Sequence, residues 1–330
     1  MNQTRSSIIV GLALFAVFIL TSCQQQDPNR GSNLPFIGGS EGLTMDFAPG
    51  APPDEVFDAA QFPFSVNIII ENVGEDDVLP DEAEIRLIGI EPGLFGVSDD
   101  DLITVLPQTL RGAVKLADGT ERPGDITQVV FPTSDVAQLS YQPDLEGTDE
   151  IIMRAEMCYD YKTRSTTQVC IKDQLLENIY NDKICVVNEE KLPQNSGAPI
   201  HITELRETPQ GKNNVNVQFK IEHLGGGLFF KLGTPCDDSI TNPNENMVKI
   251  KVYFVEVPGY EAPPIKCPLF HGETEGYVNL FQGGPRTISC TIYGNPDKDR
   301  IYQDLLHIDL EYTYLNYIEK PLIIRDVTAR

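Results

Sequence analysis

Carboxylates are the clearest chemical groups in this chain, and they gather in three short acidic runs between apolar segments. The runs are Asp76-Asp77, Asp99-Asp100-Asp101 and, beside Cys236, Asp237-Asp238. Loop carboxylates of this kind are the ligands that Ca²⁺ prefers. None of the runs has the D-x-D-x-D-G spacing of a calcium-binding loop, so we expect solvated loops and no metal site. A Ca²⁺ site is the alternative.

The residues that could support catalysis are scattered. The histidines, His201, His223, His271 and His307, are far apart along the chain, and no nucleophile, zinc-protease or phosphate-loop motif occurs in a supporting context. The run Gly225-Gly226-Gly227 follows an apolar segment, but no Lys-Ser/Thr pair follows it, so we expect a bulge or loop. The aromatic stripe Tyr312, Tyr314, Tyr317 is expected to pack, with a ligand face as the alternative. The sequence therefore predicts neither an enzyme nor a cofactor.

Two segments of the chain occur twice in the same order. Residues 157–173 align without a gap with residues 310–326, placing Tyr159 opposite Tyr312 and Tyr161 opposite Tyr314. Residues 64–74 likewise match residues 215–225, at nearly the same offset. Two matches in order predict a duplicated domain. In each copy the later segment has an apolar strand pattern, a polar break and a second strand pattern, which predicts a closing hairpin.

The pattern between these segments is that of short strands. Runs of about five to eight alternating residues are separated by turn signals such as Asp118-Gly119 and Pro123-Gly124, and no long helical period occurs. The predicted fold class is all-β, with two tandem Ig-like β-sandwich domains at residues 43–190 and 200–330. Residues 191–199 are the predicted linker between them.

The head of each copy carries the pattern V-x-V-x-I-x-N-x-G. In the first copy its positions are Val66, Ile68, Ile70, Asn72 and Gly74, and in the second they are Val217, Phe219, Ile221, His223 and Gly225. The pattern resembles the cell-adhesion-related (CARDB-like) Ig-like domains of bacterial and archaeal surface proteins. That resemblance implies an extracellular scaffold or binding module, usually without catalysis.

The N-terminus predicts a targeting segment. Residues 8–20 form an apolar run of the length of a signal peptide and short for a membrane span. The run ends in Leu20-Thr21-Ser22-Cys23, which resembles a lipobox. We therefore expect a signal peptide at residues 1–22, lipidation of Cys23 and a flexible stalk over residues 23–42. An ordinary signal peptide or an uncleaved anchor is the alternative.

The remaining cysteines are six in number, which behind a signal peptide predicts disulfides in an oxidising compartment. The second copy lacks counterparts of Cys158 and Cys170, and the first lacks counterparts of Cys267 and Cys290. We therefore expect Cys158–Cys170 and Cys267–Cys290 bonds. Cys185 and Cys236 would then pair across the two copies. The competing arrangement joins Cys185 to Cys170 or Cys158 and leaves Cys236 to pair within the second copy or to stay free.

Charge bears on the choice of partners. The chain has 25 basic and 49 acidic residues, a net charge of -24, which repels nucleic acid. We expect a non-enzymatic lipoprotein on the extracellular face of the membrane, anchored by its lipid, that presents the two domains for adhesion, binding or scaffolding. A cell-surface protein or polysaccharide is the candidate partner. The alternatives are a subunit of a surface filament or layer, and a glycan- or solute-binding accessory of an envelope enzyme.

Overall fold

A computed structural model describes residues 34–328, apart from residues 135–136, 176–183 and 238–241. The fold is all-β, as predicted: the strands form mainly antiparallel sheets, and the helices described are short 3-10 turns. Residues 35–330 form one compact unit. The predicted signal peptide and Cys23 lie outside the described residues.

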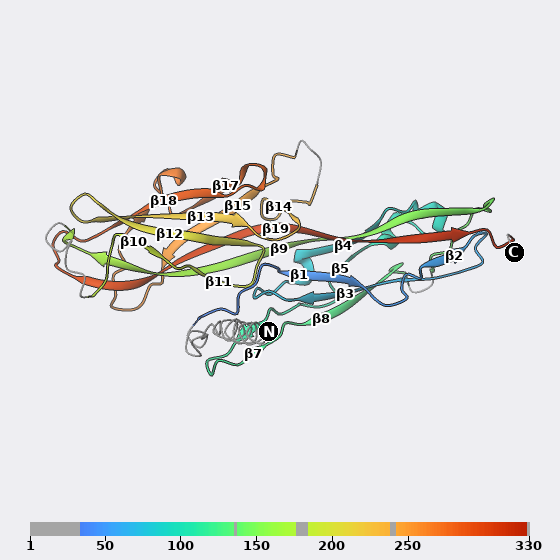
Figure 1. The fold of residues 1–330 in the computed structure, drawn as a ribbon, viewed down its shortest axis with the longest axis horizontal. Helices are drawn as coiled ribbons and strands as arrows, with labels where there is room; N and C mark the ends of the chain where they lie inside the picture. The colour runs from blue at the N-terminus through green and yellow to red at the C-terminus, as the bar shows by residue number, and fades with distance from the viewer. Residues whose placement is uncertain (1–33, 135–136, 176–183, 238–241, 329–330) are drawn as a thin grey trace, which may run out of the picture. The chain divides into compact units, whose positions relative to one another are not determined.

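One large sheet runs through this unit, with the strand order β17-β15-β19-β9-β4-β5 (Figure 1). Three short strands attach to it: β11 pairs with β9, and β14 and β2 pair with β19. β2 is the parallel one. The strands of this sheet are β2 (Glu55–Phe57), β4 (Ala83–Ile88), β5 (Ile103–Val105), β9 (Thr148–Lys172), β11 (Gln194–Asn195), β14 (Leu228–Phe230), β15 (Met247–Phe254), β17 (Glu275–Asn279) and β19 (Ile301–Arg325).

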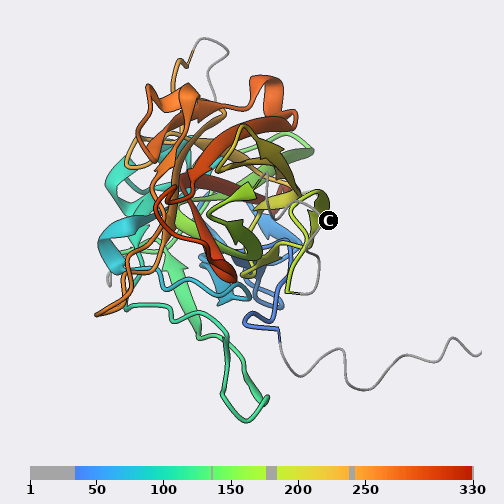
Figure 2. The same ribbon diagram turned by 90° about the vertical axis from the view of Figure 1, so that its left-hand side faces the viewer.

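Two smaller sheets pack on the face of the large sheet that carries the buried tyrosines. Their strand orders are β1-β3-β8 and β10-β12-β13-β18-β16, and a separate hairpin, β6-β7, projects away from them (Figure 2). The strands are β1 (Leu43–Phe47), β3 (Val66–Asn72), β6 (Val114–Lys115), β7 (Glu121–Arg122), β8 (Ile126–Phe131), β10 (Glu189–Lys191), β12 (Ile200–Gln210), β13 (Asn214–His223), β16 (Ile265–Lys266) and β18 (Arg286–Tyr293). The 3-10 turns are η1 (Pro80–Glu82), η2 (Pro92–Phe95), η3 (Asp99–Leu102), η4 (Pro268–Phe270) and η5 (Phe281–Gly283).

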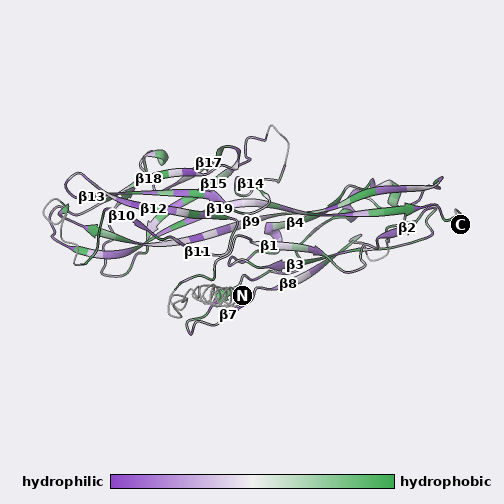
Figure 3. Ribbon diagram, viewed as in Figure 1, coloured by the Kyte–Doolittle hydropathy of each residue, from purple (hydrophilic) through white to green (hydrophobic). Residues whose placement is uncertain are grey.

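The predicted closing hairpins are wrong, because β9 and β19 are each one continuous strand of 25 residues. They pair with each other antiparallel along their whole length. The polar stretch taken for a turn keeps the strand period: Thr163, Ser165 and Thr167 all face the interior and are buried. Apolar and polar residues alternate along the strands (Figure 3), so the inward hydroxyls extend the buried face through the supposed break.

The two copies have the same connectivity. In the first copy β1 pairs with β3, β3 with β8, and β4 with β9. In the second copy, in the same order, β12 pairs with β13, β13 with β18, and β15 with β19. The duplication inferred from the sequence is therefore visible in the topology. The expectation that the copies would be separate sandwiches is not met, since their last strands, β9 and β19, join them in one sheet. β9 begins beside β4 of the first copy and ends beside β11, whereas β19 begins beside β15 and ends beside β2.

Hydrogen bonds hold both the described end of the expected stalk and the predicted linker. A single carboxylate, Glu75, accepts hydrogen bonds from the backbone N–H groups of Ile37 (3.0 Å), Gly38 (2.9 Å) and Gly197 (2.7 Å). The end of the stalk and the linker are thus attached to one loop of the first copy. In the linker, Ser196 and Ala198 are fully buried. Pro, Gly and Ser here allow close approach of backbones and do not make a flexible tether.

Candidate functional site

Four tyrosines lie where β9 and β19 cross between the copies. Tyr159 is opposite Tyr314, and Tyr161 is opposite Tyr312. In the repeat, Tyr159 aligns with Tyr312 and Tyr161 with Tyr314. A local pseudo-twofold axis that relates the two copies therefore carries one opposed pair of tyrosines onto the other. All four rings are buried, and Tyr159 makes edge contacts with both Tyr161 and Tyr314.

The V-x-V-x-I-x-N-x-G pattern holds two of these tyrosines. Tyr161 donates its hydroxyl to Asn72 Oδ1 (3.2 Å), and His223 Nε2 lies 2.9 Å from the Tyr314 hydroxyl. A Cβ at Gly74 would lie 2.0 Å from the Tyr161 oxygen, and one at Gly225 would lie 2.2 Å from the Tyr314 oxygen. Each glycine is therefore required by the approach of a phenol.

These contacts are hydrogen bonds between neutral side chains at the crossing. Burial raises the pKa of Tyr314 to about 12 and lowers the pKa of His223, so both side chains are held neutral. At the same place in the first copy, Asn72 holds Tyr161 without any titratable group. A side chain that an amide can replace in the duplicate is serving as a hydrogen-bond partner.

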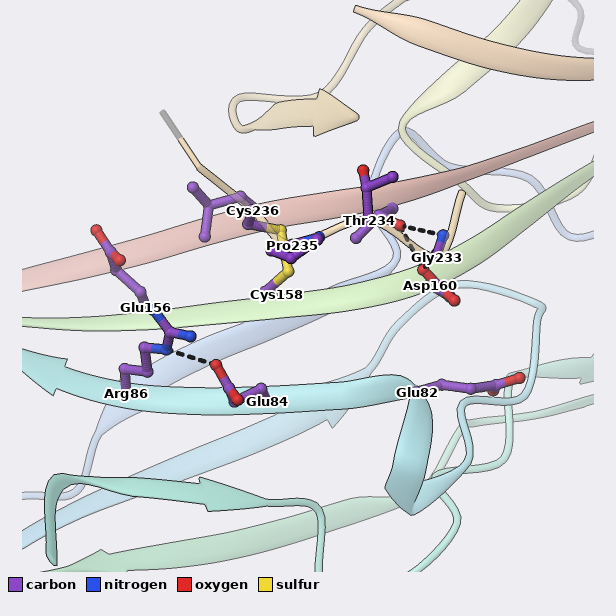
Figure 4. A pocket seen from close by; sticks show the side chains of 12 residues that line it. Glu82, Glu84, Arg86, Glu156, Cys158, Asp160, Gly233, Thr234, Pro235 and Cys236 are labelled. Atoms are coloured by element: carbon purple, nitrogen blue, oxygen red, sulfur yellow. Dashed lines mark hydrogen bonds and ion pairs between the residues drawn. A yellow bond between two sulfur atoms is a disulfide. The ribbon is translucent and has the colours of Figure 1, made fainter. Parts of the chain in front are cut away.

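On the opposite face of the shared sheet lies a cleft of about 290 Å³ (Figure 4). β4 and β9 form one side of the cleft, and the segment 233–236 forms the other. Its lining includes the four carboxylates of Glu82, Glu84, Glu156 and Asp160, and the guanidinium of Arg86. This cleft is the candidate functional site, because several charged side chains from different elements line it.

The carboxylates of the cleft already have partners. Asp160 accepts hydrogen bonds from the Thr313 hydroxyl (2.5 Å) and from Gly233 N (3.3 Å), and Glu84 pairs with Arg86 (2.5 Å). Glu156 pairs with Arg154 (3.3 Å). The lining also includes the hydroxyls of Thr234 and Thr313. The cleft can therefore bind a polar or cationic group.

All six cysteines of the described residues form disulfides, and the pairing corrects two of the three expected bonds. The structure joins Cys158 to Cys236 and Cys170 to Cys185, so the expected Cys158–Cys170 and Cys185–Cys236 bonds are wrong. The expected Cys267–Cys290 bond is confirmed.

The physical reason lies in the shared sheet. Cys158 of β9 lies opposite Leu315 of β19, and Leu315 in turn lies opposite Leu228 of β14. The segment that follows β14 therefore brings Cys236 over Cys158. The Cys158–Cys236 bond joins the two copies, although through different cysteines from those expected.

In the acidic runs, Asp76, Asp77 and Asp101 have separate hydrogen-bond partners. Asp76 pairs with Arg164 (2.9 Å), and burial raises the pKa of Asp76 to about 6. Asp77 accepts a bond from Gly112 N. Asp101 caps η3 through Ser98, and these hydrogen bonds lower its pKa. Asp238 lies outside the described residues.

The remaining histidines and the tyrosines singled out from the sequence contact backbone or other side chains. His201 Nε2 lies 3.0 Å from Gly39 O, His271 ends η4 in a left-handed conformation, and His307 stacks on Tyr253. Tyr312 and Tyr314 are core residues, as expected. Tyr317 is exposed, with the Arg154 guanidinium 4.3 Å from its ring centroid.

Sequence reasoning missed a cluster of three carboxylate side chains, those of Asp58, Asp144 and Asp326. Asp58 is fully buried, and its two oxygens accept the backbone N–H groups of Leu145 (2.7 Å) and Val327 (2.9 Å). These bonds hold the end of β19 against the first copy, which gives Asp58 a structural role. The three residues are far apart in sequence, so spacing offered no signal.

Comparison with protein-family models finds no match for this chain, and comparison with curated proteins finds none either. In the part of the chain that the structure describes, no helix is long and apolar enough to cross a bilayer.

Proposed function

We propose that this protein is a non-enzymatic surface lipoprotein, anchored through Cys23, that presents a rigid pair of Ig-like, CARDB-like sandwiches to a cell-surface protein or polysaccharide. The observation that carries the proposal is the fusion of the two copies through β9 and β19. A continuous 25-residue strand pair leaves no hinge between the copies, which suits a body that holds a binding face at a fixed place.

The entry of the chain into this body supports the same function. Ile37 and Gly38 are bound by Glu75, close to the crossing of the copies, where Tyr161 also contacts Asp76 N (3.3 Å). An anchor preceding these residues would pull on the crossing itself and not on one copy. Disulfides belong in the oxidising compartment that a surface protein occupies.

The test compares cells that display the full chain with cells that carry Cys23→Ala. The anchored protein is expected in the membrane fraction, accessible to added protease, with an acylated Cys23 by mass spectrometry. The variant is expected in the soluble fraction. A pull-down from intact cells with the anchor retained should recover a surface protein or polysaccharide. A wild-type chain that is soluble and unacylated, or that captures nothing beyond the Cys23→Ala control, would contradict the proposal.

A further inference from the structure

The strand β8 is an edge strand with one free side. It pairs with β3 through contacts such as Val66 with Phe131, and within the described residues no strand pairs with its other side. On β3, Asn67 directs its N–H and C=O toward Ala51 and Ala48, on the β1 side. Alternation then directs residues 66, 68 and 70 toward β8. It follows that the backbone groups of Ile126, Gln128 and Val130 point to the free side.

This edge also lacks the usual protection against pairing. Natural edge strands are kept apart by charges, prolines or shortness. The other edge strands of the three main sheets follow that rule, with Asp46 in β1, Glu189 in β10, Lys266 in β16, Glu275 in β17 and only three residues in β5. β8 has six residues, ITQVVF, with no charge and no proline.

The outward side chains of β8 fit a second copy of the same strand. Ile126 and Val130 are 58% and 47% exposed, and Gln128 lies between them on the same face. In an antiparallel pair, opposed residues share a face, so a symmetric pairing must centre on a residue. If the pairing centres on Gln128, Ile126 of each chain lies opposite Val130 of the other chain, and the two Gln128 amides lie side by side.

We propose that β8 is a homodimer interface, in which two copies of this chain pair antiparallel about a twofold axis at Gln128. The opposed pairs formed by residues 126, 128 and 130 would each share two backbone hydrogen bonds, and the two three-stranded sheets would become one of six strands. We favour a second molecule of this chain as the partner, because the outward pattern of apolar, amide and apolar residues pairs like with like when it meets itself antiparallel. This interface goes beyond the proposed surface function and does not depend on the anchor.

The strength of the association follows from size and charge. A single pair of short strands contributes far less than the roughly 1,200 Å² of a stable interface, so the dimer should be weak. Each chain of the dimer has a net charge of -24, so the two chains repel each other, and salt screens this repulsion. Association should therefore strengthen as the salt concentration rises, opposite to the behaviour of a dimer held by ion pairs.

The first test is cross-linking of the full chain, in detergent, through Gln128→Cys. Opposed Cα atoms in a hydrogen-bonded antiparallel pair lie about 5.5 Å apart, within disulfide reach. Mild oxidation should therefore give a covalent dimer at position 128. The matched control is Gln168→Cys, an exposed glutamine on β9, which should remain monomeric. Equal cross-linking of both variants, or of neither, overturns the proposal.

The second test is Gln128→Lys, which sets two ammonium groups opposite each other on the axis. Sedimentation equilibrium of the full chain should show the dissociation constant raised at least about tenfold, a loss of about 1.4 kcal/mol. The melting temperature should not change, because this side chain is exposed. Gln168→Lys is the control for added charge. A dissociation constant unchanged in Gln128→Lys, or a wild type that stays monomeric at high salt, contradicts the twofold pairing.

Discussion

Gly225 and Gly226, adjacent in the loop after β13, differ in how closely other atoms approach them. A Cβ at Gly225 would lie 2.2 Å from the Tyr314 oxygen and 2.6 Å from Pro199 Cβ, whereas one at Gly226 would meet nothing within 4 Å. Neither glycine has the positive φ that alone would exclude alanine. Gly227 is crowded as well, since a Cβ there would lie 2.2 Å from Leu315 O, so Gly226 is the member of the triple-glycine run that no contact requires. That the run lies in a loop was predictable from the sequence. The partner that makes Gly225 necessary was not, because Tyr314 lies about ninety residues further along the chain.

We predict that Gly225→Ala lowers the free energy of unfolding by about 1–3 kcal/mol, the usual cost of overpacking. Gly226→Ala should leave it within about 0.5 kcal/mol or raise it slightly, because alanine restricts the unfolded chain. Urea unfolding of both variants measures the difference. If the two substitutions cost the same, the Tyr314 contact does not constrain Gly225.

At the scale of elements, the sequence located most strands but not the length of the last one in each copy. A polar break was expected within residues 157–173. The polar residues 162–166 contain neither glycine nor proline, however, and their inward positions continue the alternation. What the sequence could not show is the partner of the inward Thr163 hydroxyl. Thr163 donates to Ile200 O (2.6 Å) in the other copy. A strand that leaves one core and enters another is polar at the crossing.

Two of the three disulfides were mispredicted because Cys158 and Cys170, which the second copy lacks, were assumed to pair with each other. Cys158 and Cys236 are half-buried, whereas Cys170, Cys185, Cys267 and Cys290 are buried. Thiol–disulfide exchange needs access to a sulfur. We predict that mild dithiothreitol reduces Cys158–Cys236 first.

Timed alkylation and peptide mass spectrometry of the folded chain measure the order of reduction. Cys158 and Cys236 should be labelled before the other four, with the melting temperature falling at that first step. The released loop of 78 residues would cost up to about 4–5 kcal/mol on the loop-entropy model. Earlier labelling of any buried cysteine would show that exposure does not set the order.

For the whole molecule, the crossing of β9 and β19 makes each copy depend on the other. The end of β9 is bound within the second copy, where Cys170 N donates to Glu207 Oε1 (2.9 Å). The end of β19 is bound within the first, where Asn316 Nδ2 donates to Leu43 O (2.8 Å) and Lys320 Nζ to Pro52 O (2.8 Å). Each copy therefore completes the core of its neighbour, and unfolding one exposes apolar surface in both.

We predict that the two copies unfold together. The chain contains no tryptophan, so single reporters can be placed at Phe57→Trp in the first copy and Tyr277→Trp in the second. Both positions are partly exposed, at 36% and 39%, and both rings have neighbours, Phe62 and Lys231. Urea midpoints from the two fluorescence signals should coincide with each other and with the far-ultraviolet circular dichroism of the wild type. Two separated midpoints would mean that the copies fold independently, and that the shared sheet does not couple them.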